Sequence, residues 1–208
     1  MMTDELIDLT QDRTTLRALY SPPVGAFSTV EVPKLPFVVL DGEGIPEAES
    51  IGATVKALYT AIYPIRREAR ERIGKGFVEA PVEILYWADD MRDLAAGRRD
   101  KWKWRGQITL PAWADAQRLA DSVAEMRSEL GDAHSPRWEA VTEGTCVQIL
   151  HAGNTSDLPR ILEELYGNYL PKEGLEPTGA YHEIYLDDWT RVAPEKRKII
   201  VRQPVQKI

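Results

Sequence analysis

The sequence predicts an α+β protein whose mostly antiparallel sheet carries its helices on one side. The first reason is that predicted elements follow the order strand, helix, strand, strand, and that this order occurs twice. The second is that strands and helices do not alternate one for one, as they do in parallel-sheet folds. The third is that the halves end in similar strand pairs, residues 82–87 and 102–111 and then residues 182–186 and 198–204. We therefore expect two pseudosymmetric strand-helix-strand-strand modules that share one sheet.

The first module follows a polar N-terminal stretch, residues 1–20, in which only a short helix is expected. A strand begins near Val30, and a continuous apolar strand over residues 37–41 ends in a glycine-rich turn. Apolar residues then recur at steps of three and four between residues 46 and 73, which predicts a helix. Because Pro64 cannot supply a helical backbone hydrogen bond, we expect a kink there.

A second amphipathic helix, marked by apolar residues from Leu119 to Leu130 and ended by Gly131, links the two modules. The strand around Cys146 opens the second module, and residues 153–157 read as a turn and N-cap for a third helix. We expect a single domain over residues 1–208. Its parts are module one at about 27–111, the linking helix at about 114–131 and module two at about 138–205.

The net charge of −7 argues against nucleic-acid binding, which needs a basic surface. One basic run, residues 98–105, does contain interleaved tryptophans. Strand alternation puts Trp102 and Trp104 on one face and the basic side chains on the other. A half-buried hairpin strand with a solvated basic face accounts for this run more simply than a single-strand-binding site, so no nucleic-acid partner is expected.

The cysteine and hydropathy patterns predict a cytoplasmic protein with no membrane partner. Cys146 is the single cysteine and lies in an apolar strand, so no internal disulfide can form and a buried, inert thiol is expected. No secretory signal is recognisable, and no apolar run approaches the length of a membrane span.

Glu83 and Glu183 are the leading candidates for chemistry. Each is the second residue of an otherwise apolar strand, and a buried carboxylate is costly unless it is paired or hydrogen-bonded. We expect one acid from each half to face a shared interior, where one acts as a base while the other stays protonated. The alternative is that each glutamate faces solvent or pairs with a neighbouring Arg or Lys.

The aromatic residues suggest the walls of an apolar but not wholly dry pocket. Six tryptophans and eight tyrosines stand against three phenylalanines, so most rings carry a polar group. Tyr181 and Tyr185 share the strand face of Glu183. Tyr59 and Tyr63 lie beside the expected kink, where they either pack on the sheet or tilt toward a cavity.

Neither a metal nor a cofactor is expected. His134, His151 and His182 lie far apart in the sequence, and none has the spacing of a recognised zinc site. His182 and Glu183 are adjacent on a strand and therefore point to opposite faces. The sequence also lacks a glycine-rich phosphate loop and a nucleophile elbow.

Several segments taken in order resemble the stand-alone GyrI-like (gyrase inhibitor-like) small-molecule-binding family of the effector-binding-domain superfamily. They are residues 38–44 (VVLDGEG), 101–104 (KWKW), 146–151 (CVQILH), 182–186 (HEIYL), 193–198 (APEKRK) and 202–204 (RQP). The resemblance covers roughly residues 17–205. Pro64 and Trp189 depart from the family pattern and bear on the local shape of the pocket.

The resemblance implies a ligand cleft between the two module helices. Relatives fused to DNA-binding domains sense lipophilic, often cationic drugs with a buried glutamate, and some stand-alone members hydrolyse strained cyclopropane-containing genotoxins. By motif position the key acid is Glu183, and Trp87, Trp104 and Tyr185 are implied wall residues.

Together these observations predict a protein that binds lipophilic, planar or cationic xenobiotics and hydrolyses cyclopropane-containing electrophiles. In this hypothesis Glu183 orients or deprotonates water, and Glu83 or Tyr185 donates a proton to the substrate. The expected ligand-binding residues are Trp87, Trp104, Tyr59, Tyr63 and Tyr181. The alternative is a non-catalytic drug-binding or effector-sensing module. The sequence leaves the natural ligand and the oligomeric state open.

Overall fold

The computed structural model describes residues 5–42, 44–90, 93–94, 96–131, 135–189 and 191–208. Its strands are β1 (Ser28–Val32), β2 (Leu35–Asp41), β3 (Val82–Trp87), β4 (Lys103–Thr109), β5 (Arg137–Val141), β6 (Gly144–Ala152), β7 (Leu175–Pro177), β8 (Tyr181–Tyr185) and β9 (Lys198–Lys207). Its α-helices are α1 (Arg13–Tyr20), α2 (Ala48–Ala61), α3 (Tyr63–Ile73), α5 (Ala116–Glu125), α6 (Arg127–Leu130), α7 (Leu158–Glu164) and α8 (Leu170–Lys172). His134 lies outside the described residues.

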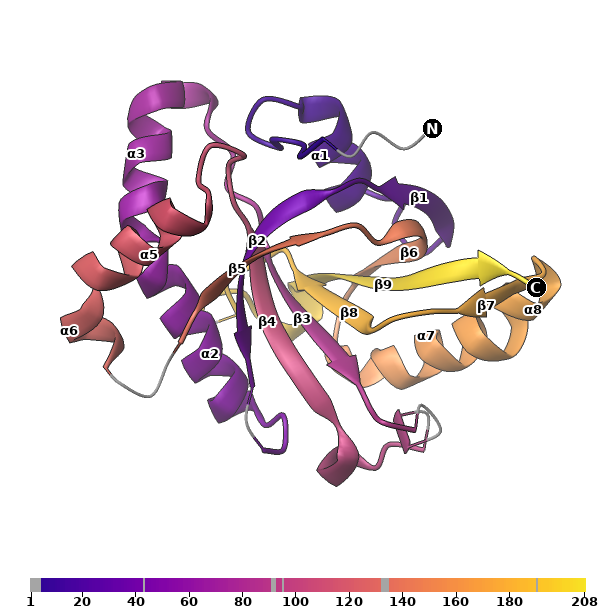
Figure 1. Cartoon of the computed structure of the whole chain (residues 1–208). Coiled ribbons are helices and arrows are strands. Elements are labelled where there is room, and N and C mark those ends of the chain that lie inside the picture. Colours follow the sequence, from indigo (N-terminus) through magenta and orange to yellow (C-terminus); the bar gives the residue numbers. More distant parts are fainter. Residues whose placement is uncertain (1–4, 43, 91–92, 95, 132–134, 190) are drawn as a thin grey trace.

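The strands of the described residues form a sheet of order β1-β6-β9-β8-β3-β4-β2-β5, with β7 added beside the end of β9 (Figure 1). All the strand pairs in this order are antiparallel. The order is mirrored about the junction of β8 and β3, because β6-β9-β8 on one side matches β2-β4-β3 on the other. The predicted α+β class and the mostly antiparallel sheet with two similar halves are therefore confirmed.

Most helices pack on one face of this sheet and build the larger core. That core joins apolar residues of α2, α3, α5, α7 and α8 to sheet residues such as Ile84, Tyr86 and Val201. In Figure 1, α2, α3, α5 and α6 lie on the left and α7 and α8 at the lower right. The helices of the two halves therefore cover separate parts of the sheet.

The other face is covered by the N-terminal segment, which sequence patterning described only as polar with a short helix. Leu19 and Tyr20 of α1 pack with Phe37, Cys146 and Ile184 in a second, smaller core. Polar contacts join the segment to the sheet as well, since Gln148 Nε2 donates to the carbonyl of Ala18 at 2.9 Å. The sheet is thus sealed on both faces, and its central strands are buried.

The predicted long helix is divided where Pro64 begins a new one. α2 ends at Ala61, and α3 starts at Tyr63 with Pro64 in its first turn, where a missing N–H costs nothing. The predicted third helix is also interrupted, because Leu165–Tyr169 forms a π-helical turn between α7 and α8. The first interruption divides the predicted helix into two, and the second inserts a π-helical turn between two helical segments.

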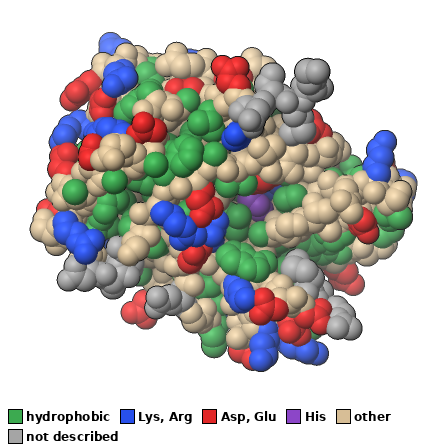
Figure 2. All heavy atoms as spheres, viewed as in Figure 1, with side chains coloured by type: hydrophobic (Ala, Val, Ile, Leu, Met, Phe, Trp, Pro, Cys, Tyr) green, Lys and Arg blue, Asp and Glu red, His purple; other side chains and the backbone are tan. Residues whose placement is uncertain are grey.

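Charges of both signs are interspersed on the face shown in Figure 2. The basic run at residues 98–105 follows this pattern, because three of its basic side chains form ion pairs. The pairs are Arg98 with Asp93 at 2.6 Å, Lys103 with Asp89 at 2.5 Å and Arg105 with Asp41 at 2.7 Å. Acidic partners thus reduce the positive field that binding to phosphates would use. Among the described residues, no helix combines the length and apolarity needed to cross a membrane.

Gly42 is required by the packing of Trp104. A Cβ built on Gly42 would lie 2.0 Å from the Trp104 ring, whose Nε1 donates to the carbonyl of Gly44 at 3.1 Å. We predict that Gly42→Ala destabilises the protein by about 1–3 kcal/mol through overpacking. Gly52→Ala is the matched control, because a methyl group on Gly52 in α2 would meet nothing within 4 Å and helix propensity favours Ala. Urea unfolding should rank Gly52→Ala at or above the wild type and Gly42→Ala below it; equal midpoints for the two variants would contradict the packing argument.

Asp12 caps α1 and should make part of the stability depend on pH. Its carboxylate accepts hydrogen bonds from the hydroxyl (2.7 Å) and backbone N–H (2.9 Å) of Thr15, and these lower the pKa of Asp12. Because the folded-state pKa is depressed, this contribution is present above the unfolded pKa and is lost as pH falls through the folded value.

We predict that Asp12→Ala costs about 0.5–2 kcal/mol at neutral pH and less in acid, where the wild-type carboxylate is protonated. Chemical unfolding at several pH values measures this. A difference between variant and wild type that does not shrink toward acidic pH would show that the charge of Asp12 does not stabilise α1.

Candidate functional site

Glu183 lies in the middle of β8, on the sheet face that carries α2 and α7. Its side chain is half-buried, and both carboxylate oxygens accept hydrogen bonds from tyrosines of the same strand. Tyr181 donates to Oε1 at 2.7 Å and Tyr185 donates to Oε2 at 2.6 Å. The period-two alternation of a strand explains this arrangement, since residues 181, 183 and 185 must share one face.

Further aromatic rings surround this carboxylate. Tyr86 of β3, the cross-strand partner of Tyr181, stacks on it with ring centroids 5.9 Å apart. The Trp102 ring lies edge-on to Tyr86 at 5.6 Å, and the Trp189 ring lies edge-on to Tyr185 at 4.5 Å. Glu183 is therefore bordered by aromatic faces, an environment that also attracts cations.

The surroundings of Glu183 shift its protonation equilibrium. Burial raises the pKa of Glu183, although hydrogen bonds from Tyr185 and Tyr181 and the positive charge of Arg99 partly oppose this rise. Burial, with the negative charge of Glu183 as the next cause, likewise keeps the pKa of Tyr181 and Tyr185 well above the ordinary tyrosine value. The tyrosines thus remain neutral donors, and the carboxylate binds a proton more readily than one in water.

Glu83 does not share this site, and the expectation of a common acid pair is wrong. In the β3–β8 register Glu183 pairs with Ile84, whereas Glu83 pairs with Ile184. Directly paired residues point to the same face, so the two glutamates point to opposite faces. The repeated letters align the two glutamates 100 residues apart. In this register, paired residues of β3 and β8 differ in number by an odd amount, as Ile84 and Glu183 do. Two residues that differ by 100, an even number, therefore point to opposite faces.

Glu83 instead lies in a buried polar cluster beneath α1. Tyr20 donates to its Oε1 at 2.7 Å and Gln107 donates to its Oε2 at 2.9 Å. Burial raises the pKa of Glu83, but contacts with His182 and Arg202 outweigh burial and lower it to about 2. Glu83 is therefore a permanently ionised, fully buried carboxylate, which is unsuited to donate a proton to a ligand beside Glu183.

The two predicted tryptophans do not line the surface around Glu183. Trp87 lies on the opposite face of β3, where the Arg105 guanidinium is 6.0 Å from its ring. Trp104 is on the same face as Tyr86 but is only 1 % exposed, and its ring packs against Gly42. Trp104 therefore belongs to the core, and Trp87 cannot reach Glu183 through the sheet.

The two predicted helical tyrosines are separated from each other. Tyr59 is half-buried at the end of α2 with the Arg66 guanidinium 4.9 Å from its ring. The pKa of Tyr59 is raised first by burial and also by nearby acids that include Asp188, in the loop next to Trp189. Tyr63 is 48 % exposed at the start of α3. Only Tyr59 therefore lies toward the loop that follows β8.

Three aromatic neighbours of Glu183 were not predicted as site residues. The expectation that Glu83 lies in the site assigned Ile84 and Tyr86 to the opposite face of β3 and so outside the site. In the structure Ile84 and Tyr86 lie on the face of Glu183, and Trp102, just before β4, lies on that same face. Trp189 is held over Tyr185 by Arg197, which stacks on it at 4.8 Å and donates to its carbonyl at 2.9 Å. If the two halves had been aligned with Glu183 opposite Ile84 instead of Glu83, Tyr86 would have been aligned with Tyr185 and identified as a site residue.

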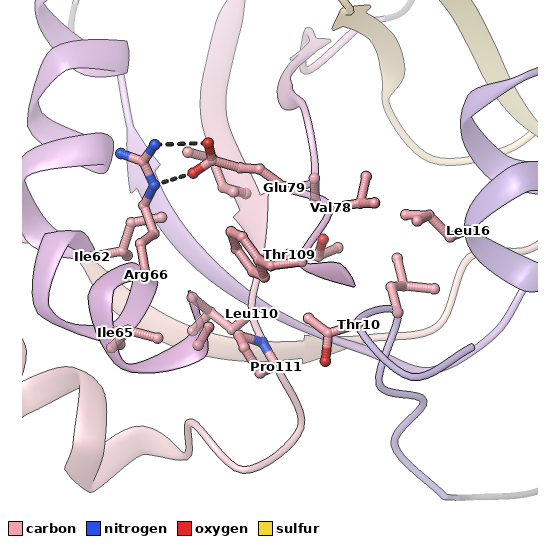
Figure 3. A pocket seen from close by; sticks show the side chains of 15 residues that line it. Thr10, Leu16, Ile62, Ile65, Arg66, Val78, Glu79, Thr109, Leu110 and Pro111 are labelled. Atoms are coloured by element: carbon pink, nitrogen blue, oxygen red, sulfur yellow. Dashed lines mark hydrogen bonds and ion pairs between the residues drawn. The ribbon is translucent and has the colours of Figure 1, made fainter. Parts of the chain in front are cut away.

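A cavity in the described structure lies elsewhere, between α3, the end of β4 and the N-terminal segment (Figure 3). Leu16, Ile65 and Leu110 are among its lining residues, and an ion pair between Arg66 and Glu79 closes one side. Its volume of about 30 Å³ is close to the share of one water molecule in the liquid. It is too small for a drug-sized ligand, and the cavity expected beside Glu183 stays a prediction.

Comparison with known proteins places this geometry in a family. Residues 26–205 match the model of the GyrI-like small molecule binding domain. No curated protein matches the sequence. Among solved structures, an uncharacterized conserved protein from Listeria innocua is 28% identical with a TM-score of 0.77, over 96% of this chain and 100% of that one. A hydrolase from the same organism is 27% identical with a TM-score of 0.73, again over 96% of this chain and 100% of that one.

A more distant structure shares only the fold. The C-terminal domain of EcmrR is 14% identical with a TM-score of 0.54, over 88% of this chain and 98% of that domain. The family model, in contrast, covers far more than half of the sequence, including β8 and the residues around Glu183. This chain therefore belongs to the GyrI-like family of small-molecule-binding domains.

Proposed function

We propose that this GyrI-like domain binds lipophilic, planar or cationic xenobiotics at Glu183 and hydrolyses those that carry a strained cyclopropane ring. The observation that carries the proposal is the half-buried Glu183 carboxylate held by Tyr181 and Tyr185 among aromatic rings. The Listeria innocua relative described as a hydrolase, similar over its whole length, adds support. Detoxification in the cytoplasm is part of the same proposal.

In the proposed reaction Glu183 acts as the base. It takes a proton from a water molecule, whose oxygen attacks a cyclopropane carbon as the strained C–C bond breaks. The bonding electrons move to an electron-withdrawing oxygen of the substrate. The tyrosine hydroxyls hold the carboxylate in place, and once Glu183 is protonated the Tyr185 O–H is free to donate to that oxygen. The proton on Glu183 then passes to the enolate carbon left by the broken C–C bond, which restores the carbonyl, so the net change is the addition of one water.

The aromatic side chains supply the affinity. Tyr185 and Trp189, which are half-buried, present ring faces and edges to a planar ligand, whereas the stacked rings of Tyr86 and Tyr181 belong to the buried core beside Glu183. Water excluded by these rings strengthens the polar contacts at the carboxylate. A cationic ligand gains in addition from the charge of Glu183. The same site therefore serves binding and hydrolysis.

Glu183→Gln separates hydrolysis from binding. We predict a fall in the hydrolysis rate of a neutral cyclopropyl ketone by about 10²–10⁴, because the amide cannot take the proton of water. The affinity for that ketone, measured by tryptophan quenching, should change less than threefold. Glu195→Gln, an exposed acid in the following loop, is the matched control and should behave as wild type.

The competing hypothesis is a non-catalytic drug-binding module in which Glu183 is only a counter-ion. That hypothesis requires no turnover by the wild type and a selective loss of cationic dyes in Glu183→Gln. Mass spectrometry for water addition to a panel of cyclopropyl compounds decides between the two. If the wild type hydrolyses none of them, or if Glu183→Gln halves the rate or less, the catalytic role of Glu183 is wrong.

Tyr185→Phe tests whether the tyrosine hydroxyls position the carboxylate. It removes the 2.6 Å hydrogen bond to Oε2 while keeping the ring. We predict that kcat falls at least tenfold with little change in KM, since a hydrogen bond to a charged group is worth about 1.5–3 kcal/mol. Tyr63→Phe, at an exposed position away from Glu183, is the control. A Tyr185→Phe enzyme with unchanged kcat would show that the hydroxyl has no part in the reaction.

A further inference from the structure

A second cluster of ionisable side chains is buried on the opposite face of the sheet. Glu83 comes from β3, His182 from β8 and Glu143 from the turn between β5 and β6. One donor atom from each of the three lies within 4.8 Å of the other two. Their side chains are 1 %, 2 % and 6 % exposed respectively. This cluster is separated from Glu183 by the sheet itself.

The carboxylate of Glu143 is the least compensated member. It enters the interior from a surface turn, although a buried carboxylate needs strong partners to offset the loss of hydration. Its described contacts are Nε2 of His182 and Sγ of Cys146, each at 3.5 Å. Charge-assisted hydrogen bonds are normally about 2.7–2.9 Å long. The contact with His182 is longer than this, and the thiol of Cys146 is only a weak donor, so the two together offset the burial of Glu143 incompletely.

His182 is also incompletely bonded. Its Nδ1 is buried and makes no hydrogen bond among the described residues, and Oε2 of Glu83 lies 3.4 Å away. Each ring nitrogen thus faces a carboxylate oxygen at a distance longer than a good hydrogen bond.

Arg202 does not resolve the imbalance. Its guanidinium donates to the carbonyl of Leu19 at 2.6 Å and to Oε1 of Gln148 at 3.1 Å. Its Nη1 lies 3.9 Å from Oε1 of Glu83. The shortest bonds of this cation therefore go to neutral acceptors; its charge acts first on Glu83, its described ion-pair contact, and then on Glu143.

The spacing of the donors suits a metal ion instead. Ligands bound at about 2.1 Å in a tetrahedral arrangement lie about 3.4 Å from one another. One donor atom from each of Glu83, Glu143 and His182 lies within 4.8 Å of the other two, so an inward movement would bring the three to this spacing. The 3.4 Å contact of Glu83 is with Nδ1 and the 3.5 Å contact of Glu143 is with Nε2, so an ion bound at one ring nitrogen would have to draw in the carboxylate that faces the other. We propose that Glu83, Glu143 and His182 bind one divalent transition-metal ion between the sheet and the N-terminal segment.

The donor set favours zinc. Two carboxylates cancel the charge of a divalent ion, and imidazole selects transition metals over Mg²⁺ and Ca²⁺. A ring nitrogen that does not bind the metal would donate its hydrogen to a neighbouring carboxylate oxygen, as is usual for metal-bound histidine. Because Glu143 lies in a surface turn, a movement of its side chain would let the ion reach the cluster from solvent. The inference does not depend on hydrolysis or on any ligand at Glu183.

The test uses the full chain without an affinity tag, dialysed against a chelator and then titrated with ZnCl₂ by calorimetry. We expect one saturable site per chain and a rise in Tm of several degrees at about 100 µM Zn²⁺. Glu143→Gln should weaken Zn²⁺ binding at least tenfold. Glu143→Asp, which keeps the charge but shortens the side chain, serves as a second variant if Glu143→Gln folds poorly.

Glu195→Gln and His151→Gln are the controls, because they remove an exposed carboxylate and a histidine outside the cluster and should leave Zn²⁺ affinity unchanged. Three outcomes would overturn the proposal. They are no saturable binding by the wild type, equal affinity in the wild type and both Glu143 variants, or an equal loss in the controls. The first of these would identify the cluster as a metal-free polar network.

Discussion

The antiparallel pairing of β3 with β8 at the centre of the sheet organises the rest of this structure. It joins the two halves, and its register assigns each side chain of both strands to one face or the other. Because successive strand residues alternate, His182 and Glu183 are neighbours in the chain but belong to two different polar sites. One site lies among aromatic rings on the face that carries the helices, and the other lies beneath α1.

The two sites solve the problem of a buried carboxylate in different ways. Around Glu183 the compensation comes from neutral tyrosine hydroxyls, which stabilise the charge without cancelling it. Around Glu83 the compensation comes from Arg202, Gln107 and Tyr20, which hold the carboxylate ionised. The first environment suits binding and proton transfer, whereas the second suits a permanent structural charge or a metal ligand.

The N-terminal segment is as important to this arrangement as the paired modules. Without α1, the smaller core and the cluster around Glu83 would face water, and a charge network that is buried would be solvated. Tyr20 and the carbonyl of Leu19 bond directly to Glu83 and Arg202. The segment preceding the family match at residue 26 therefore completes the far face of the sheet.

The order and type of most elements and an interruption of the long helix at Pro64, expected as a kink, were readable from the sequence, because periodicity and proline chemistry act over a few residues. The family resemblance was readable as well. The sequence could not decide which strands pair or in which register. That choice, made by long-range packing, moved Glu83 and Trp87 to the opposite face from Glu183 and placed Trp104 in the core. It also brought Glu83, Glu143 and His182 together from three distant segments, which no spacing within the sequence could reveal.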